Sequence, residues 1–345
     1  MAAADRARAD RVWSGAAWPV RAAVRAFRRA HPGVGDDVCV ALSGGADSLA
    51  LTAAAAAEFA RVTALVVDHG LQEDSRRVAE DAAGAARRIG ATAQVLVVTV
   101  TPTGSGPEAD ARAARYAALD AARAGRPVLL GHTLDDQAET VLLGLGRGSG
   151  ARSLRGMAAW DAPWGRPLLG VRAADTRAAC RALGLEWWED PHNADPAYAR
   201  VRIRREVLPL LEEVMGGGVA EGLARTAGLL RGDDDELERR AAAVPVADGA
   251  ALDVGELEPL PTPVLTRVLR NWLRAGGVPS PTYAHLVAVA ALVTDWRGQG
   301  PVAVGGAGLG GSERAGAPDS PTRLVARRSH GKLVLQIDRA SEAGT

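Results

Sequence analysis

Short apolar runs alternate with longer segments of helical spacing from residue 37 to about residue 145. Four runs rich in valine and leucine lie at 37–42, 62–68, 94–100 and 127–132. Both faces of each run are apolar, which is expected of strands in a parallel sheet that helices cover on both sides. The intervening segments at 47–60, 74–89, 107–124 and 134–145 have the spacing of helices. The pattern predicts a doubly wound α/β domain with a mostly parallel sheet, where ligands bind at the carboxyl ends of the strands.

The alternation stops after about residue 205. Segments 219–243 and 262–277 have the pattern of amphipathic helices. A stretch rich in glycine at 304–320 is predicted to be a flexible loop between possible short strands at 301–306 and 323–337, and the last residues, 339–345, to be disordered. We therefore expect a helical lead-in over 1–34, the α/β domain over 35–210, and a smaller, mainly helical second domain over 211–345.

Composition and charge bear on whether the protein binds nucleic acid, contains disulfides or enters a membrane. The 41 basic and 41 acidic residues cancel, so any binding of nucleic acid must rest on local patches. The two cysteines, Cys39 and Cys180, form no C-x-x-C motif. Charges near the start replace the apolar core of a signal peptide, and the apolar run 49–57 is too short to span a bilayer. We expect a soluble, cytoplasmic protein without a membrane partner, its oligomeric state open between monomer and homodimer.

A turn rich in small residues joins the first predicted strand to the first predicted helix. It consists of Ser43, Gly44, Gly45, Ala46, Asp47 and Ser48. Unpaired N–H groups at the start of a helix can bind phosphate, although such a turn can also be only a connection. It is not the G-x-x-x-x-G-K-[ST] loop, because the only lysine of the chain is Lys332. Asp47 favours phosphate binding over a plain connection, since a carboxylate beside a phosphate requires a divalent cation or an amine between the two groups.

Polar residues follow the other strands at the same predicted edge of the sheet. Asp135, Asp136 and Glu139 lie at the start of the helix at 134–145, where their spacing lets them share part of one face. They suit Mg²⁺ or the amine of an amino acid, or they are only an acidic helix start that opposes the helix dipole. The remaining residues at this edge are Asp68, His69, Gly70 and His132.

Two groups of arginines are candidates for binding anions. Arg112 and Arg115 lie one helical turn apart, and Tyr198 precedes a basic stripe of Arg200, Arg202, Arg204 and Arg205. A basic stripe beside an aromatic residue suits contact with a nucleic-acid backbone, although in a chain so rich in arginine both groups could be solvated surface. The chemistry of the segment around Arg155 does not follow from its residues.

The motifs, in this order, resemble one family. They are S-G-G-x-D-S (43–48), V-D-H-G-L (67–71), A-R-x-x-R-Y (111–116), G-H-x-x-D-D-Q-x-E-T (131–140), L-R-G-M (154–157), R-P-L-L (166–169), E-D-P-x-N (189–193) and Y-x-R-x-R-I-R (198–204). The first is similar to the loop of the ATP pyrophosphatases, and the whole series resembles bacterial tRNA(Ile)-lysidine synthases from about residue 37 to residue 210. The resemblance implies an adenine nucleotide alpha hydrolase-like PP-loop domain followed by a tRNA-binding domain.

The resemblance also implies a ligase reaction and a role for each candidate residue. ATP adenylates the wobble cytidine of the CAU anticodon of tRNA(Ile), and free L-lysine then displaces AMP to give lysidine. Residues 43–48, with Asp68, His69, Gly70 and His132, would bind ATP, and Asp47 and Asp136 would hold Mg²⁺. The catalytic set would be Asp47, Arg112, Arg115, Asp135, Asp136 and Glu139, and the tRNA contacts Arg155, Tyr198, Arg200, Arg202, Arg204 and Arg205.

Two features set this chain apart within the resemblance. Val201 stands where the family pattern has asparagine, which puts in doubt any contact from that side chain. The length of 345 residues resembles that of a short form of the family, which would be expected to lack the further C-terminal domain of longer members.

Three other functions compete. A tRNA thiolase of the same superfamily would need cysteines, often as C-x-x-C, which this chain lacks. A GMP or NAD synthetase would not explain the basic stripe at 198–205, and a tRNA-binding module without catalysis would give Asp47 and the acids at 135–139 no role.

Overall fold

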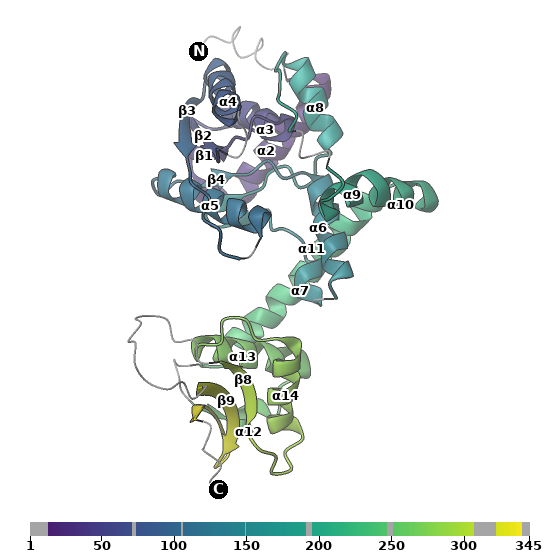
Figure 1. Cartoon of the computed structure of the whole chain (residues 1–345). Helices are drawn as coiled ribbons and strands as arrows, with labels where there is room; N and C mark the ends of the chain where they lie inside the picture. Colours follow the sequence, from purple (N-terminus) through teal and green to yellow (C-terminus); the bar gives the residue numbers. More distant parts are fainter. Residues whose placement is uncertain are drawn as a thin grey trace. The chain divides into compact units, whose positions relative to one another are not determined.

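The computed structural model describes residues 13–70, 74–104, 106–148, 150–190, 195–246, 251–306 and 322–339. They belong to two compact units, divided between Arg231 and Gly232 (Figure 1). The strands of the first unit are β1 (Asp37–Ala41), β2 (Arg61–Asp68), β3 (Thr92–Val97), β4 (Val128–Leu129), β5 (Trp160–Asp161) and β6 (Trp164–Gly165). Its helices are α2 (Trp18–Ala30), α3 (Ala46–Glu58), α4 (Ser75–Ile89), α5 (Pro107–Ala122), α6 (Leu134–Gly146), α7 (Ala151–Leu154), α8 (Ala173–Ala182), α9 (Ala199–Arg202) and α10 (Leu208–Met215).

The strands of the first unit form one mostly parallel sheet. Their order is β3-β2-β1-β4-β6-β5, with only β5 antiparallel to its neighbour in the described structure. Parallel registers pair Val38 with Val62 and Cys39 with Val128. The chain moves outward from β1 to β3 and then returns to place β4 on the other side of β1, so the topological switch point lies between β1 and β4. A ligand of such a sheet is expected at that point.

Helices cover both faces of this sheet, as predicted. Val38 and Val40 of β1 pack into a core with residues of α2, α3, α4 and α8. Cys39, between them, points to the opposite face and packs with Leu119 of α5. Figure 1 shows α5 on the other side of the sheet from α2 and α3. The apolar character of both faces of β1 therefore arises from two separate cores.

The third strand is shorter than its apolar run. The run continues to residue 100, but β3 ends at Val97. The Val98 N–H still donates to the Asp68 carbonyl oxygen at 2.9 Å, and β2 ends at that residue. No further part of β2 is present to pair with the run, which therefore leaves the sheet. The lead-in also belongs to this unit, because Val20, Val24 and Phe27 of α2 are buried in its core.

The second unit combines helices with an antiparallel sheet. Its helices are α12 (Val254–Leu257), α13 (Thr262–Ala275) and α14 (Tyr283–Thr294), and α11 (Val219–Ala242) continues into it. Its strands are β7 (Leu252–Asp253), β8 (Val302–Gly306), β9 (Thr322–Ser329) and β10 (Lys332–Arg339), in the order β7-β10-β9-β8. The helices predicted at 219–243 and 262–277 are α11 and α13, and the predicted strand regions 301–306 and 323–337 contain β8 and the pair β9 and β10. The elements α12, α14 and β7 were not expected. Their shared core surrounds Trp272, which is almost fully buried.

Two expectations fall largely outside the described residues. The flexible loop was predicted at 304–320, and its first residues, 304–306, form the end of β8. The disordered tail was predicted at 339–345, and its first residue, 339, ends β10. Among the residues that the structure describes, none of the helices has the length and apolar character needed to cross a membrane.

Candidate active site

The turn after β1 is a compact loop closed by a serine. Gly44 has φ +86°, a backbone conformation that side chains disfavour, and α3 begins two residues later. The Ser48 hydroxyl accepts a hydrogen bond from the Ser43 N–H at 3.1 Å and donates to the Gly45 carbonyl oxygen at 3.0 Å. These bonds tie the loop to the first turn of α3. They leave the start of this helix, with its partial positive charge, at the carboxyl end of β1.

The segment after β4 packs directly against this loop. Gly131 has no side chain, and a Cβ atom built there would lie 3.0 Å from both Cα and N of Ser48. Backbone therefore meets backbone between the two segments at the switch point. His132, the next residue, belongs to the same edge of the sheet as the loop.

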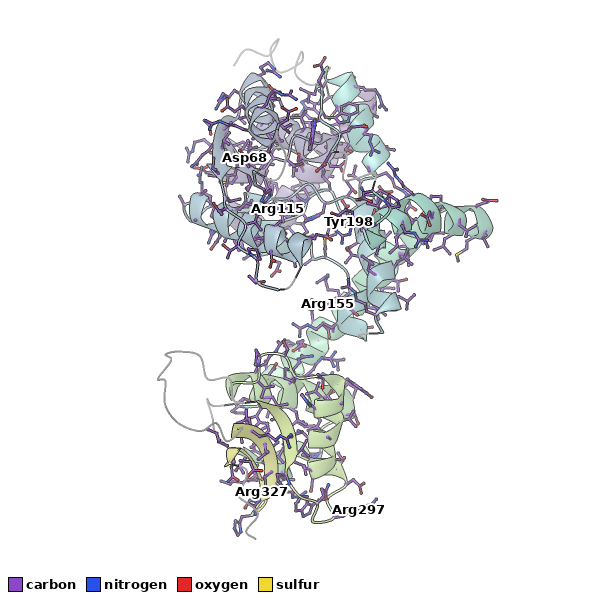
Figure 2. All side chains as sticks on the ribbon, viewed as in Figure 1. Asp68, Arg115, Arg155, Tyr198, Arg297 and Arg327 are labelled. Carbon is purple, nitrogen blue, oxygen red and sulfur yellow. The ribbon has the colours of Figure 1, made fainter. Side chains whose placement is uncertain are left out.

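A cavity of about 840 Å³ opens at this edge, and most of the predicted site residues line it. Those that do are Ser43, Gly45, Ala46, Asp47, Ser48, Asp68, His69, Arg115, His132, Asp136, Arg200, Arg204 and Arg205. Those outside its lining are Gly44, Gly70, Arg112, Asp135, Glu139, Arg155, Tyr198 and Arg202. Figure 2 labels Asp68 and Arg115, which border the cavity, and Arg155 and Tyr198, which do not.

Asp47 is held by a residue that the sequence analysis did not single out. The Thr176 hydroxyl, fully buried on α8, donates a hydrogen bond to Oδ1 of Asp47. Burial raises the pKa of the Asp47 carboxyl, although this hydrogen bond and the charge of Arg177 act in the opposite direction. The contact fixes one carboxylate oxygen, so Oδ2 is the oxygen available to meet a cation.

Asp136 faces the cavity at the start of α6. Its Oδ2 accepts a hydrogen bond from the Thr133 N–H at 2.8 Å, while the Thr133 hydroxyl accepts one from the Asp136 N–H. This reciprocal pair closes the first turn of the helix. Oδ1 pairs with Arg204 at 2.9 Å. Asp136 therefore combines a local structural role with a position in the cavity.

Glu139 lies one turn further along α6 and is fully buried. It pairs with Arg204 through two bonds, at 2.5 Å and 3.1 Å, and with Arg200 at 3.6 Å. Burial raises the pKa of Glu139, and the hydrogen bonds of Arg204 oppose that rise. Two of the arginines predicted to contact tRNA thus hold the acids of the site. A π-helical turn over Ile203–Val207 contains Arg204, and such turns are frequent at functional sites.

Asp135 does not share the cavity with its neighbour. Its carboxylate accepts hydrogen bonds from the Ala173 N–H at 2.7 Å and from Arg172 at 3.2 Å. Arg172 also pairs with Glu212 at 3.1 Å and Glu221 at 2.8 Å. Burial acts to lower the pKa of Arg172, but the bonds to these carboxylates outweigh it and raise the pKa. Asp135 therefore belongs to an ion-pair network that joins α6 to α10 and α11.

Burial shifts both histidines of the cavity toward the neutral form. Burial lowers the pKa of His132 to about 4, and burial followed by the charge of Arg115 lowers the pKa of His69. The Nδ1 atom of each ring is buried without a hydrogen-bond partner among the described residues. Neutral imidazoles can accept a hydrogen bond from a ligand, and they add no positive charge to the cavity.

Arg112 and Arg115 differ in position although both contact one tyrosine. The Arg112 guanidinium lies 4.9 Å from the centre of the Tyr116 ring, and that of Arg115 lies 6.0 Å from it. Only Arg115, of these two, lines the cavity in the described structure. Tyr116 lines it as well and packs edge-on against Trp164. Arg115 is therefore the better candidate to meet an anion.

Part of the cavity wall comes from a segment that carried no candidate residue. Helix α8 contributes Arg177, and the chain after it contributes Trp187 and Trp188. The Trp188 N–H donates to the Gly44 carbonyl oxygen at 3.0 Å, so this segment is joined to the loop by its backbone. Apart from the E-D-P-x-N motif beside it, the sequence held no signal for this wall.

The donor set of the cavity fits a hydrated Mg²⁺ better than a metal held by protein alone. No group of three or more His, Cys, Asp or Glu side chains with metal-binding geometry occurs in the described part of the chain. Asp47 and Asp136 both face the cavity. Mg²⁺ is commonly bound by one or two carboxylates together with substrate phosphates and water, which is what these two residues could supply beside a phosphate loop.

The fold and the site together define a class of protein. A glycine-rich loop at the switch point of a parallel sheet, with an acid in the first helical turn after it, is the arrangement of a PP-loop nucleotide-binding protein. A model of the PP-loop domain matches residues 22–211, and a model of the TilS substrate binding domain matches residues 252–334.

Curated relatives narrow this class to one family. The tRNA(Ile)-lysidine synthase of Nocardia farcinica is 57% identical over 328 residues, which cover 94% of this chain and 99% of the relative. That of Rhodococcus erythropolis is 58% identical over 87% of this chain and 90% of its own. That of Mycobacterium tuberculosis is 54% identical over 92% of this chain and 96% of its own. This chain belongs to the tRNA(Ile)-lysidine synthase family.

Proposed function

We propose that this protein attaches lysine to the wobble cytidine of the CAU anticodon of tRNA(Ile). The cytidine 2-carbonyl oxygen attacks the α-phosphorus of ATP, and pyrophosphate leaves. The lysine ε-amine then attacks C2, loses a proton, and displaces AMP as the C–O bond breaks. The modified base pairs with A instead of G, so the tRNA changes from methionine to isoleucine identity. With tRNA as its substrate, the reaction takes place in the cytoplasm.

A single cavity that is lined by a phosphate loop and by three residues of a mixed-charge cluster, Asp136, Arg200 and Arg204, is the observation that carries this proposal. The loop over residues 43–48 and the start of α3 would bind the phosphates of ATP. Asp47 and Asp136 would hold Mg²⁺, which neutralises charge on the phosphates when bound. Arg115 would offset charge on the adenylate. Positioning and electrostatic stabilisation of this kind supply most of the rate in phosphoryl-type chemistry.

The mixed-charge cluster is the proposed site for lysine. It consists of Asp136 and Glu139 with Arg200 and Arg204. The carboxylate of Asp136, which lines the cavity, suits the ammonium group of this ligand, and the buried Glu139 holds Arg200 and Arg204 in place behind it. Asp135 is not included, because its carboxylate is bound to Arg172 and Ala173 and not to Arg200 or Arg204.

Incubation of a CAU-anticodon tRNA transcript with the protein, ATP, Mg²⁺ and lysine tests the proposed reaction. We expect the mass of the tRNA to increase by that of lysine minus water. An increase that requires a sulfur donor instead of lysine would identify a thiolase. Binding of the transcript without any change in mass would identify a module without catalysis, and either result would overturn the proposal.

Replacement of Thr176 should weaken the effect of Mg²⁺ on ATP binding. Thr176→Val removes the hydroxyl that fixes Asp47 but keeps the shape of the buried side chain. We expect the gain in ATP affinity from added Mg²⁺, measured by calorimetry, to fall roughly tenfold, about the value of one hydrogen bond to a charged group. Thr176→Ser keeps the hydroxyl and should restore the gain. Equal losses in both variants would show that Thr176 only supports packing.

Neutralising Arg202 should weaken the binding of tRNA and its dependence on salt. Arg202 is exposed and pairs only with Glu206 among the described residues, at 2.9 Å. If Arg202 contacts a phosphate of the tRNA, Arg202→Gln should make the plot of log affinity against log salt less steep by about 0.9, the value for one contact on duplex DNA. Arg61 offers a matched control, because it is exposed and paired with Asp37 at 3.0 Å at the opposite end of the strands. The same slope in Arg202→Gln as in the unchanged protein would make Arg202 ordinary surface charge.

A further inference from the structure

Helix α8 is held against the phosphate loop at two consecutive positions of the loop. The Cys180 thiol donates to the Ala46 carbonyl oxygen at 3.4 Å, and the Thr176 hydroxyl donates to Asp47. Both side chains of α8 are fully buried. The helix is therefore part of the wall beside the loop, and a residue next to these contacts has its backbone held close to the loop.

Arg177 is that residue. It follows Thr176 directly and lines the cavity together with Ser43 and Gly45. Its charge acts on the Asp47 carboxyl and lowers the pKa of that group against the larger effect of burial. The guanidinium makes no hydrogen bond or ion pair within the described part of the chain.

Two other arginines of the cavity, Arg200 and Arg204, are already engaged by carboxylates of the protein. Arg204 is bonded to Glu139 and Asp136, and Arg200 to Glu139 and Thr140. Releasing them to a phosphate would leave the buried Glu139 carboxylate without its partners, which is costly. Arg177 can instead bind an anion without breaking an ion pair.

A triphosphate in this loop needs more positive charge than the start of α3 provides. A helix start carries only about half an elementary charge, and Asp47 adds a negative charge beside it. A guanidinium can bind two phosphate oxygens at once. We propose that Arg177 contacts the β- and γ-phosphates of ATP and so holds the pyrophosphate that leaves during adenylation. This inference rests on the proposed function only in taking ATP as the nucleotide.

Binding of ATP, AMP and pyrophosphate to the full chain in Mg²⁺, measured by calorimetry, tests the assignment. In Arg177→Met we expect the affinities for ATP and pyrophosphate to fall by roughly ten- to a hundredfold, the range for a lost hydrogen bond to a charged group. The affinity for AMP should stay the same, because AMP lacks both distal phosphates. Arg181→Met is the matched control, since it removes the same charge one turn further along α8 from an exposed residue outside the cavity lining.

Each of the other possible outcomes overturns the assignment of Arg177, the proposed function, or both. Equal losses for ATP and AMP would place Arg177 at the adenylate end or in a structural role, and unchanged ATP affinity with weaker tRNA binding would make it an RNA contact. Both results overturn the assignment. If the protein without substitutions binds ATP but attaches no lysine, the proposed function alone is overturned. If it binds no ATP, the proposed function and the assignment of Arg177 are both overturned.

Discussion

Asp47→Asn should reduce the release of pyrophosphate by roughly a hundred- to a thousandfold, the effect typical of losing one preorganised electrostatic group at a reaction centre. The amide keeps the shape of the side chain and can still accept the hydrogen bond from Thr176. What it loses is the charge that holds Mg²⁺ against the phosphates. The affinity for tRNA should stay within a few fold, because Asp47 acts on ATP and not on the RNA.

Two measurements separate this expectation from a general loss of folding. Pyrophosphate release is followed in a coupled assay, and tRNA affinity by filter binding on the same preparation. Asp81→Asn is a suitable control, since Asp81 is an exposed acid of α4 that pairs with Arg77 at 3.6 Å. If Asp47→Asn lost tRNA binding as strongly as pyrophosphate release, Asp47 would be a structural residue.

The acids of α6 should separate the two half-reactions. Glu139→Gln leaves Arg204 and Arg200 without the carboxylate that they share, so the cluster becomes more positive where an ammonium must bind. We expect the concentration of lysine at half saturation to rise by roughly ten- to a hundredfold, as for a lost charge-assisted interaction. Release of pyrophosphate without lysine should survive, because the phosphate loop is not changed.

The neighbouring acids provide the comparison. Asp135→Asn should leave lysine saturation unchanged, because Asp135 pairs with Arg172 outside the cavity lining. Asp136→Asn should impair both half-reactions, since Asp136 faces the cavity as a proposed Mg²⁺ ligand and as a partner of Arg204. Full lysine saturation in all three variants would show that the amine is bound elsewhere.

Much of the first unit could be predicted because its strands are buried on both faces. The apolar run at 37–42 predicted β1 within one residue, and the helix predicted at 47–60 is α3, Ala46–Glu58. The end of β3 could not be predicted from its own residues, because it depends on where the neighbouring strand β2 stops. A pattern of hydrophobic residues indicates which residues are buried, but it does not indicate how long the neighbouring strand is.

The site was predictable where a motif carried it and not where side chains from distant elements meet. Thr176 contacts Asp47 across 129 residues of sequence, and nothing around it marks that contact. Asp135 and Asp136 look equivalent in sequence, but consecutive residues point about 100° apart on a helix, and only the packing of α6 decides which one faces the cavity. The predicted basic stripe mixed residues of the cavity, such as Arg204, with surface residues such as Arg202.

The contact of Gly131 with the backbone of Ser48 limits how this protein can diverge. Even a methyl group at position 131 would force the start of α3 away from the end of β4. Selection in a mutant library should therefore accept almost no substitution at Gly131, although it should accept many at Gly170, where a Cβ atom meets nothing within 4 Å. The side chains that line the cavity should tolerate exchange more readily than this glycine, because backbone atoms do not confine them in the same way. We expect the spacing between the phosphate loop and the segment that leads into α6 to stay the same in variants of this chain, because backbone atoms set it.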